Sequence, residues 1–310
     1  MKLTGRILYL SEEPGQIRDQ LVTGSSPQSI ESFHYGVNTD AMISGRACTL
    51  GYTPKILGPY FLENFKEEVA KDDIRTGGFQ VVAGGDAYGS GSSREVAVVA
   101  HQGAGIELVV AKSFQRIFQE NMVYAGMPFT TDFSVLERLK AGEEIDVGQF
   151  HRELPPFFRQ VAESGGLLSY ANAWLAGTVN PWYATDGAAR PMNVVEKIIA
   201  ARGWSGGAPG VEGGPLFGLS EVQPGDQVLC RAGFRGMHEY TAGMVMALYE
   251  EAFGKVAVHE PEQCASFEDH FVLIDQPSVP DEVKSTRLAP ARRLAEEMVE
   301  ACERHGIRLH

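Results

Sequence analysis

A turn rich in glycine and serine stands between a predicted strand and a predicted helix in the first third of the chain. The strand is predicted at 78–83, where the apolar run GFQVVA ends in two further glycines. The turn, YGSGSSRE, occupies 88–95, and an apolar stretch that suits a helix follows it to residue 101. The next strand is predicted at 105–110 and the next helix at 114–124. The order strand, glycine turn, helix, strand predicts an α/β unit.

The residues of this turn suit an anion. Glycines let the backbone approach a ligand closely, and the start of a helix offers free N–H groups and a partial positive charge. Ser92 and Ser93 add hydroxyls, and Arg94 supplies a planar fork that matches a carboxylate. Arg94 stands where a dinucleotide fingerprint has its third glycine, and the spacing fits neither a Walker loop nor the elbow of a serine hydrolase. On residue chemistry alone, the turn is either a carboxylate or phosphate site or an ordinary helix cap.

Apolar periodicity predicts further elements. A first strand is expected at 5–10, followed by a polar excursion from 11 to about 32. The apolar residues within 194–199 share one face of a helix that Gly203 can end. The remaining expected elements are strands at 227–231 and 267–274, a helix at 241–252, and a last helix that opens near Pro290 and ends by Gly306.

Composition narrows the classes of partner. A chain of 310 residues, 44% apolar and 22% charged, suits a globular protein of two domains. The net charge of −13 argues against nucleic acid, because phosphate binding needs a basic face. A small anionic substrate remains compatible, since salt screens a distant acidic surface within about 10 Å. The first apolar run is too short for a signal peptide and no window approaches a membrane span, so we expect a cytoplasmic protein with no membrane partner.

The turn and the segment after it closely resemble the swivel domain of aconitases and the small subunit of 3-isopropylmalate dehydratase. In that family a G-x-G-S-S-R-E turn precedes a helix, and a strand then leads into K/P-S-F-x-x-I-x-x-x-N and a Gly-hydrophobic-Pro turn. The matching residues in this chain are Lys112, Ser113, Phe114, Ile117, Asn121, Gly126 and Pro128. Upstream, Val37-Asn38-Thr39-Asp40 through Gly45-Arg46 looks like the family's N-x-D-T-D…P-A/G-R segment. The resemblance covers about residues 34–135.

This resemblance implies roles for the turn residues. Ser92 would be the general base, acting as an alkoxide that removes the proton next to a substrate carboxylate. Ser93 and Arg94 would bind carboxylate, and Arg46 would join them from the facing loop. The pKa of a serine hydroxyl is too high for it to ionise unaided. That pKa is lowered by the helix N-terminus, by nearby N–H groups and by the charge of the arginine.

Residues 191–310 resemble a different part of the same family, the opening of the large catalytic subunit. The matching stretches are MNVVEKIIA (192–200), VQPGD (222–226), MHEYTA (237–242) and Asp269-His270. The resemblance implies that His238 contacts substrate. It also implies that Asp269 holds the imidazole of His270 charged, so that His270 can protonate the departing hydroxyl. From the residues alone, Asp269-His270 is a surface pair on a strand.

The cysteines bear on the cofactor. There are four, widely spaced and without a C-x-x-C pair, which favours ordinary part-buried thiols; they are Cys48, Cys230, Cys264 and Cys302. The family's cluster cysteines lie in a part of the large subunit beyond what this chain contains. The resemblance therefore implies a [4Fe–4S] cluster held by a partner chain, with no metal ligand from this one. We expect that partner to carry the rest of the catalytic domain.

The sequence thus predicts an α/β protein in two parts. An aconitase-type swivel domain with β/β/α layers (1–176) is followed by a linker (177–190) and a partial α/β catalytic domain (191–310). The favoured function is a subunit of an aconitase-like hydro-lyase that acts on a hydroxy-polycarboxylic acid and is active only with its partner. The alternative is a non-catalytic carboxylate-binding or regulatory subunit that has lost the cluster chemistry. Val96 stands where the family usually has histidine, and the two parts come in the reverse order of a fused aconitase.

Overall fold

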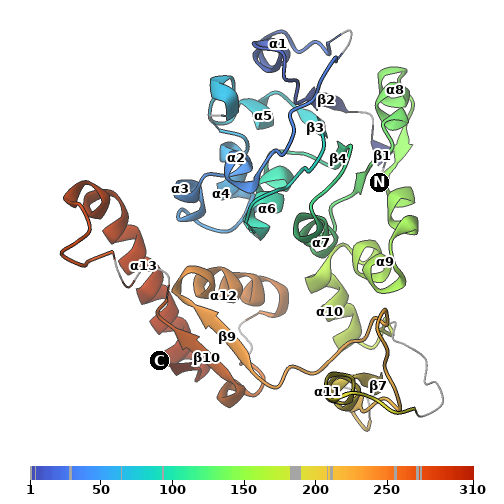
Figure 1. Ribbon diagram of the computed structural model, residues 1–310, viewed down its shortest axis with the longest axis vertical. Helices are drawn as coiled ribbons and strands as arrows, with labels where there is room; N and C mark the ends of the chain where they lie inside the picture. The colour runs from blue at the N-terminus through green and yellow to red at the C-terminus, as the bar shows by residue number, and fades with distance from the viewer. Residues whose placement is uncertain are drawn as a thin grey trace. The chain divides into compact units, whose positions relative to one another are not determined.

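The structure is a computed structural model, and it divides into two compact units, Met1–Ala173 and Trp174–His310 (Figure 1). The residues that it describes are 2–3, 5–27, 30–63, 65–92, 94–181, 190–207, 209, 212–254, 257–269, 272 and 274–310. Both units combine helices with a parallel sheet, which confirms the α/β class. No helix in the described part of the chain is both long enough and apolar enough to cross a membrane.

The first unit is built on a four-stranded parallel sheet in the order β2-β3-β4-β5. Its strands are β2 (Arg6–Tyr9), β3 (Phe79–Gly84), β4 (Leu108–Ala111) and β5 (Phe129–Thr130). Every residue of β4 is buried, and so are four consecutive residues of β3 from Val81 onward. Near-continuous apolar strands of this kind are typical of parallel sheets covered on both faces. The expected strands at 5–10, 78–83 and 105–110 are confirmed with small shifts in their ends.

Helices connect these strands. The two crossover helices are α6 (Glu95–Gly103) and α7 (Arg116–Tyr124), which confirms the expected helices after the glycine turn and after the second strand. The other helices and short strands of this unit are α1 (Gln16–Thr23), α2 (Thr39–Met42), α3 (Gly45–Cys48), α4 (Pro54–Leu57), η1 (Gly58–Tyr60), η2 (Phe65–Glu67), α5 (Asp73–Thr76), α8 (Ser134–Lys140), η3 (Val147–Glu153), α9 (Pro156–Glu163), α10 (Leu167–Leu175), β1 (Lys2–Leu3) and β6 (Ile145–Asp146). Strands β1 and β6 pair antiparallel, and their buried Leu3 and Ile145 join one core cluster with Val81 and Ala83 of β3.

The polar excursion after the first strand contains helix α1, which protects the free edge of β2. The amide side chain of Gln20 is buried, and it bonds the backbone of Tyr9 twice. Gln20 Oε1 accepts from the Tyr9 N–H at 2.8 Å, and Gln20 Nε2 donates to the Tyr9 carbonyl at 2.8 Å. An exposed sheet edge is a site for unwanted strand pairing, and this glutamine occupies its hydrogen-bonding groups at that residue.

The second unit contains a three-stranded parallel sheet in the order β11-β10-β9. Its strands are β9 (Arg235–His238), β10 (Cys264–Phe267) and β11 (Arg308–Leu309), and a separate antiparallel pair is formed by β7 (Trp204–Gly206) and β8 (Leu216–Phe217). Its helices are α11 (Val194–Arg202), α12 (Glu239–Phe253), η4 (Pro261–Gln263) and α13 (Asp281–His305). One core cluster joins α12, α13 and β10 through Met246, Met298 and Cys264.

Several expectations for this unit need correction. The segment 227–231 is not a strand; it makes one isolated bridge, Gly203 with Cys230. The strand expected at 267–274 corresponds to β10 (Cys264–Phe267), which begins earlier and ends at Phe267, opposite the end of its partner β9 at His238; residues 270, 271 and 273 of the expected strand lie outside the described residues. The last helix begins nine residues before Pro290, which lies inside it; its end before Gly306 is confirmed.

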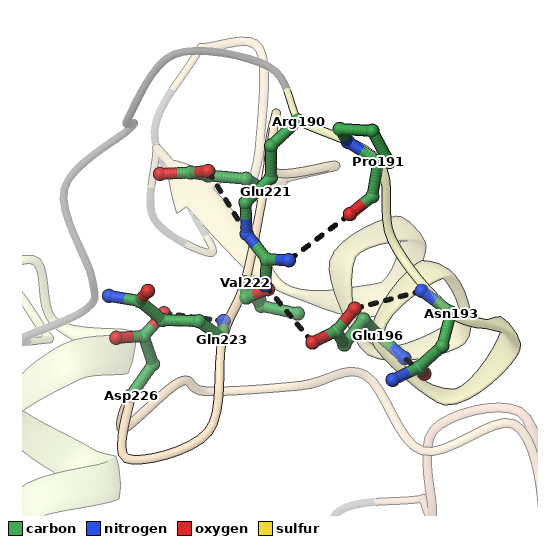
Figure 2. Close-up of polar contacts among 8 residues, drawn as sticks. All are labelled: Arg190, Pro191, Asn193, Glu196, Glu221, Val222, Gln223 and Asp226. Atoms are coloured by element: carbon green, nitrogen blue, oxygen red, sulfur yellow. Dashed lines mark hydrogen bonds and ion pairs between the residues drawn. The ribbon is translucent and has the colours of Figure 1, made fainter.

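Arg190 anchors the entry to α11 (Figure 2). Its guanidinium donates to Glu196 at 3.0 Å and to the carbonyl of Val222, and it lies 3.4 Å from the carboxylate of Glu221. Glu196 also forms a capping box with Asn193, in which each side chain accepts from the other residue's backbone N–H. The hydrogen bond from the Asn193 backbone, followed by the one from Arg190, lowers the pKa of Glu196. One arginine therefore ties the helix start to the loop at 221–222.

Candidate functional site

The turn between β3 and α6 is held by the segment that precedes α2. The N–H of Gly89 donates to the carbonyl of Val37 at 2.8 Å, and the N–H of Thr39 donates to the carbonyl of Ser90 at 2.9 Å. The hydroxyl of Ser90 donates to the Gly36 carbonyl at 3.0 Å. The structure therefore brings together the two segments, 37–46 and 88–95, that carry the family resemblance.

Two glycines allow this close approach. Gly89 (φ 79°) and Gly91 (φ 93°) both adopt the left-handed conformation that side chains disfavour. A Cβ on Gly89 would lie 2.1 Å from Cγ of Phe118, which no real contact permits. A Cβ on Gly91 would lie 3.5 Å from Oγ1 of Thr39. Glycine at 89 is thus required both by the backbone and by the packing beneath the turn.

Ser92 is exposed on this turn, at the carboxyl end of β3. Its Oγ lies 3.1 Å from Oγ1 of Thr39, and Thr39 Oγ1 also lies 3.3 Å from the Ser92 carbonyl oxygen. Thr39 itself is only 1% exposed. Ligands of open α/β sheets bind outside the carboxyl ends of parallel strands, which is where this hydroxyl lies. Ser93, the other serine named from sequence, lies outside the described residues.

Arg94 lies at the N-terminal end of α6 and is already engaged by a carboxylate. Its guanidinium pairs with Asp40 and donates to the carbonyl of Ile43 at 3.4 Å. The Arg94 side chain is 23% exposed and that of Asp40 is 63% exposed. Arg46 is exposed on α3, three residues after Ile43, so the two arginines lie on neighbouring segments. In this structure the partner of the Arg94 guanidinium is thus a carboxylate of the chain itself, and its binding of a substrate carboxylate stays a prediction.

A cavity of about 360 Å³ adjoins the turn through Asp40. His34, Ser44, Glu63 and Lys66 contribute to its lining, so it carries acidic, basic and neutral polar groups together. Burial, followed by the nearby charge of Lys66, lowers the pKa of His34. Asp40, which pairs with Arg94, is the residue that links this cavity to the turn; neither Arg94 nor Ser92 lines it.

In the second unit, His238 and Asp269 lie at the carboxyl edge of the parallel sheet. His238 is the last residue of β9 and pairs with Phe267, the last residue of β10, and Asp269 follows two residues later. The N–H of Asp269 donates to Oε2 of Glu239 at 2.9 Å, and Glu239 is 1% exposed at the start of α12. The structure thus brings these two predicted residues to one edge through a buried glutamate. His270 lies outside the described residues.

Sequence reasoning did not single out Thr39, Asp40 or Glu239. Thr39 and Asp40 stand inside the segment that matched the family, and Glu239 follows His238 directly, but their contacts with the predicted residues are seen only in the structure.

The four cysteine thiols are not grouped at the turn of the first unit or at the sheet edge of the second. Cys48 is buried on α3 of the first unit, whereas Cys264 and Cys302 fill the apolar core of the second and Cys230 is exposed. Burial raises the pKa of Cys302, which an interaction with Ser266 partly offsets. Among the residues that the structure describes, no three His, Cys, Asp or Glu side chains are grouped as metal ligands. These residues do not fit an iron–sulfur cluster.

The fold and turn define an α/β protein with an anion-suited serine turn at the carboxyl end of a parallel strand. Residues 67–131 match the family described as Aconitase C-terminal domain. The 3-isopropylmalate dehydratase small subunit 1 of Archaeoglobus fulgidus is 31% identical over 151 residues, which are 44% of this chain and 91% of that one. The isopropylmalate/citramalate isomerase small subunit of Methanocaldococcus jannaschii is 31% identical over 159 residues, 46% of this chain and 92% of that one.

Two further comparisons complete the set. The 3-isopropylmalate dehydratase small subunit of Methanosarcina acetivorans is 34% identical, covering 44% of this chain and 89% of that one. A solved structure of 3-isopropylmalate dehydratase from Methanocaldococcus jannaschii is 28% identical with a TM-score of 0.32, covering 44% of this chain and 87% of that one. The chain belongs to the aconitase and 3-isopropylmalate dehydratase superfamily, with the small subunits as its relatives, and the resemblance of its first part to those small subunits is confirmed. The resemblance of residues 191–310 to the opening of the large subunit stays a prediction.

Proposed function

We propose that this chain is one subunit of an aconitase-type hydro-lyase that removes water from a hydroxy-polycarboxylic acid. One observation carries the proposal: Ser92 is exposed on a glycine turn beside Arg94, in a chain whose relatives are named as dehydratase and isomerase small subunits. A hydroxyl next to a fixed arginine can act on the carbon adjacent to a bound carboxylate.

In this proposal Ser92 is the general base. Its alkoxide takes the proton from the carbon next to a substrate carboxylate and becomes a neutral hydroxyl, and the C–H electron pair forms the new double bond. Arg94, Ser93 and Arg46 hold the carboxylate. Because Asp40 pairs with Arg94, a substrate carboxylate would compete with it or share the guanidinium. The charge of Arg94 also favours the ionised serine.

The departing hydroxyl leaves the neighbouring carbon with a proton, so that water is the product. We assign that proton to His270, held charged by Asp269, with His238 as a substrate contact. Support comes from the sheet edge of the second unit, where Glu239 fixes the backbone of Asp269 close to the end of β9. Parallel strands commonly carry ligand-contacting residues at this end.

We propose the same domain division that the sequence suggests. Residues 1–176 form a swivel domain with β/β/α layers, 177–190 a linker, of which 182–189 lie outside the described residues, and 191–310 part of a catalytic domain. The two compact units, each with its own parallel sheet and core cluster, support this division.

A partner chain completes the proposed enzyme. It would carry the rest of the catalytic domain and the thiolates of a [4Fe–4S] cluster, which would supply Lewis-acid chemistry. The support is that the relatives of this chain are named as small subunits of a dehydratase or isomerase, and that residues 67–131 match the aconitase C-terminal domain.

The second candidate is a carboxylate-binding or regulatory subunit without its own chemistry. The engagement of Arg94 by Asp40 favours it, since a site that binds carboxylate needs no base. In that case Ser92 would be a turn residue and its replacement would leave any activity of the complex intact.

The test uses the chain co-expressed with the product of the reading frame next to its own in the genome, the candidate for the proposed partner, and purified without oxygen. Turnover of 3-isopropylmalate and of citramalate is followed by the ultraviolet absorbance of the conjugated double bond, for the parent chain and for Ser92→Ala. We expect turnover of at least one of these acids, lost by a factor of about 1,000 in Ser92→Ala, which is the loss typical of a catalytic group. Saturable binding without turnover, or full activity in Ser92→Ala, would favour the second candidate.

A further inference from the structure

We propose that Thr39 is a positioning residue for Ser92: its hydroxyl holds the serine oxygen and donates to it once the serine has lost its proton. This inference rests on the proposed function of Ser92. It starts from the 3.1 Å separation between Thr39 Oγ1 and Ser92 Oγ, which joins residues 53 positions apart in the chain.

The backbone of Thr39 is fixed on both sides. Thr39 is the first residue of α2, and the cap residue Asn38 accepts from the Ala41 N–H at 2.7 Å. The Thr39 N–H donates to the Ser90 carbonyl at 2.9 Å, within the serine turn itself. With only 1% of Thr39 exposed, its hydroxyl cannot turn to bulk water. These hydrogen bonds tie the threonine to the turn.

The hydroxyl of Thr39 carries one proton and faces two acceptors on the same residue. These are the Ser92 carbonyl at 3.3 Å and Ser92 Oγ at 3.1 Å. With neutral Ser92, Thr39 can donate to the carbonyl and accept from the serine hydroxyl. With ionised Ser92, a rotation about the Cβ–Oγ1 bond turns the proton to the alkoxide. Hydrogen bonds to an ionised oxygen are about twice as strong as neutral ones, so Thr39 stabilises the alkoxide more than the alcohol.

Other charges around the turn act in addition. Arg94 and Glu95 stand at the start of α6, and Asp40 on α2 pairs with Arg94. Burial raises the pKa of Glu95. His34, Glu63 and Lys66 line the adjoining cavity. Because Thr39 has no charge, replacing it changes none of these groups, and its effect can be separated from theirs.

Two substitutions isolate the hydroxyl. Thr39→Val removes it and keeps the branched shape, whereas Thr39→Ser keeps it. Thr130→Val is the matched control, because Thr130 is also a buried threonine, 9% exposed, whose hydroxyl accepts a local bond from the Asp132 N–H two residues away.

The first measurement needs no turnover. The thiol introduced by Ser92→Cys replaces the oxygen that Thr39 contacts, and its alkylation by iodoacetamide is followed against pH by peptide mass spectrometry, which separates it from exposed Cys230. We expect Thr39→Val to move the alkylation curve about half to one pH unit higher and Thr39→Ser to leave it near the parent. A curve that does not move in Thr39→Val, or moves equally in Thr130→Val, overturns the inference whether or not the complex is an enzyme.

The second measurement is the pH profile of kcat/KM for the co-expressed complex on the acid that it turns over. We expect Thr39→Val to lower kcat/KM about tenfold, to move the ascending limb about one unit higher and to leave KM within about twofold, with recovery in Thr39→Ser. If Ser92→Ala is inactive and Thr39→Val is unchanged, this inference fails and the proposed function stands. If Ser92→Ala keeps full activity, the proposed function fails.

Discussion

The hydroxyl of Tyr88 lies 2.8 Å from Nε2 of His101, and both side chains are fully buried. The other ring nitrogen of His101, Nδ1, lies 2.7 Å from the carbonyl of Ala97, an acceptor, so Nδ1 carries the hydrogen and Nε2 accepts from Tyr88. This pair connects the first residue of the serine turn to α6. Burial lowers the pKa of His101 to about 4, against a smaller raising effect of the Ala97 bond.

Because His101 is buried and neutral, we expect the protein to lose stability in mild acid. The unfolded chain protonates His101 below its ordinary pKa of 6.5, whereas the folded chain keeps it neutral down to about 4. The neutral His101 therefore contributes fully to the free energy of unfolding above pH 6.5, and this contribution is lost as the pH falls toward 4. The difference in pKa corresponds to about 3 kcal/mol of unfolding free energy. Urea unfolding followed by circular dichroism measures it.

The control for this prediction is the double variant Tyr88→Phe with His101→Leu, which removes the titrating group and leaves no orphaned hydroxyl. It should lose less stability than the parent over the same pH interval. Equal losses in the two proteins would assign the acid sensitivity to carboxylates elsewhere.

Two glycines with the same backbone conformation should differ in what they tolerate. Gly89 (φ 79°) and Gly142 (φ 80°) are both left-handed, but a Cβ would meet Phe118 at Gly89 and nothing within 4 Å at Gly142. We expect Gly142→Ala to cost about 1 kcal/mol, from backbone strain alone. Gly89→Ala should cost about 1–3 kcal/mol more, because the core beneath it is overpacked. Urea unfolding measures the loss of stability in both variants. Similar losses would show that the Phe118 side chain moves aside without a measurable loss of stability.

The framework of the first unit could be predicted because its signals are local. A buried apolar run, a glycine turn and a helical stretch follow one another within 78–103, and parallel pairing then places β3 between β2 and β4. The contact of Thr39 with Ser92 has no such signal, since it spans 53 positions and depends on how the α2 segment docks. Helix α1 was not predicted because its residues are mostly polar. Its buried amide, Gln20, forms hydrogen bonds with the edge of a strand.

The second unit was harder to predict from the sequence because several of its apolar residues are exposed. Val194, Val195 and Ile198 share a helix, but they are 70%, 59% and 61% exposed. Strand β10 ends at the residue that pairs with the last residue of β9. The apolar pattern of the sequence does not contain this limit, because it is set by pairing with another strand. Pro290 reads as a helix start, but the helix continues through it, anchored by the packing of Leu294 and Met298.

The capping box at the start of α11 should contribute measurably to the stability of the second unit. Asn193 Oδ1 accepts from the Glu196 N–H at 3.0 Å, beside the Arg190 contacts (Figure 2). We expect Asn193→Ala to lower the unfolding free energy by about 1 kcal/mol and Asn193→Asp, which keeps an acceptor, to change it little. Tryptophan fluorescence during urea unfolding reports this unit, because every tryptophan of the chain lies between 174 and 204. An unchanged midpoint in Asn193→Ala would contradict the prediction.

The buried carboxylate of Glu239 should control the position of Asp269. Its Oε2 accepts from the Asp269 N–H at 2.9 Å, so Glu239→Leu leaves that N–H without its acceptor, whereas Glu239→Gln keeps an oxygen of similar shape. We expect amide exchange of the peptide containing Asp269 to quicken at least tenfold in Glu239→Leu and to stay near the parent in Glu239→Gln. In the co-expressed complex, Glu239→Leu should lower kcat about a hundredfold, because a displacement of about 1 Å in a catalytic group has that effect. Unchanged exchange in Glu239→Leu would mean that other contacts hold Asp269. Quickened exchange with full turnover would instead remove Asp269 from the proposed acid pair.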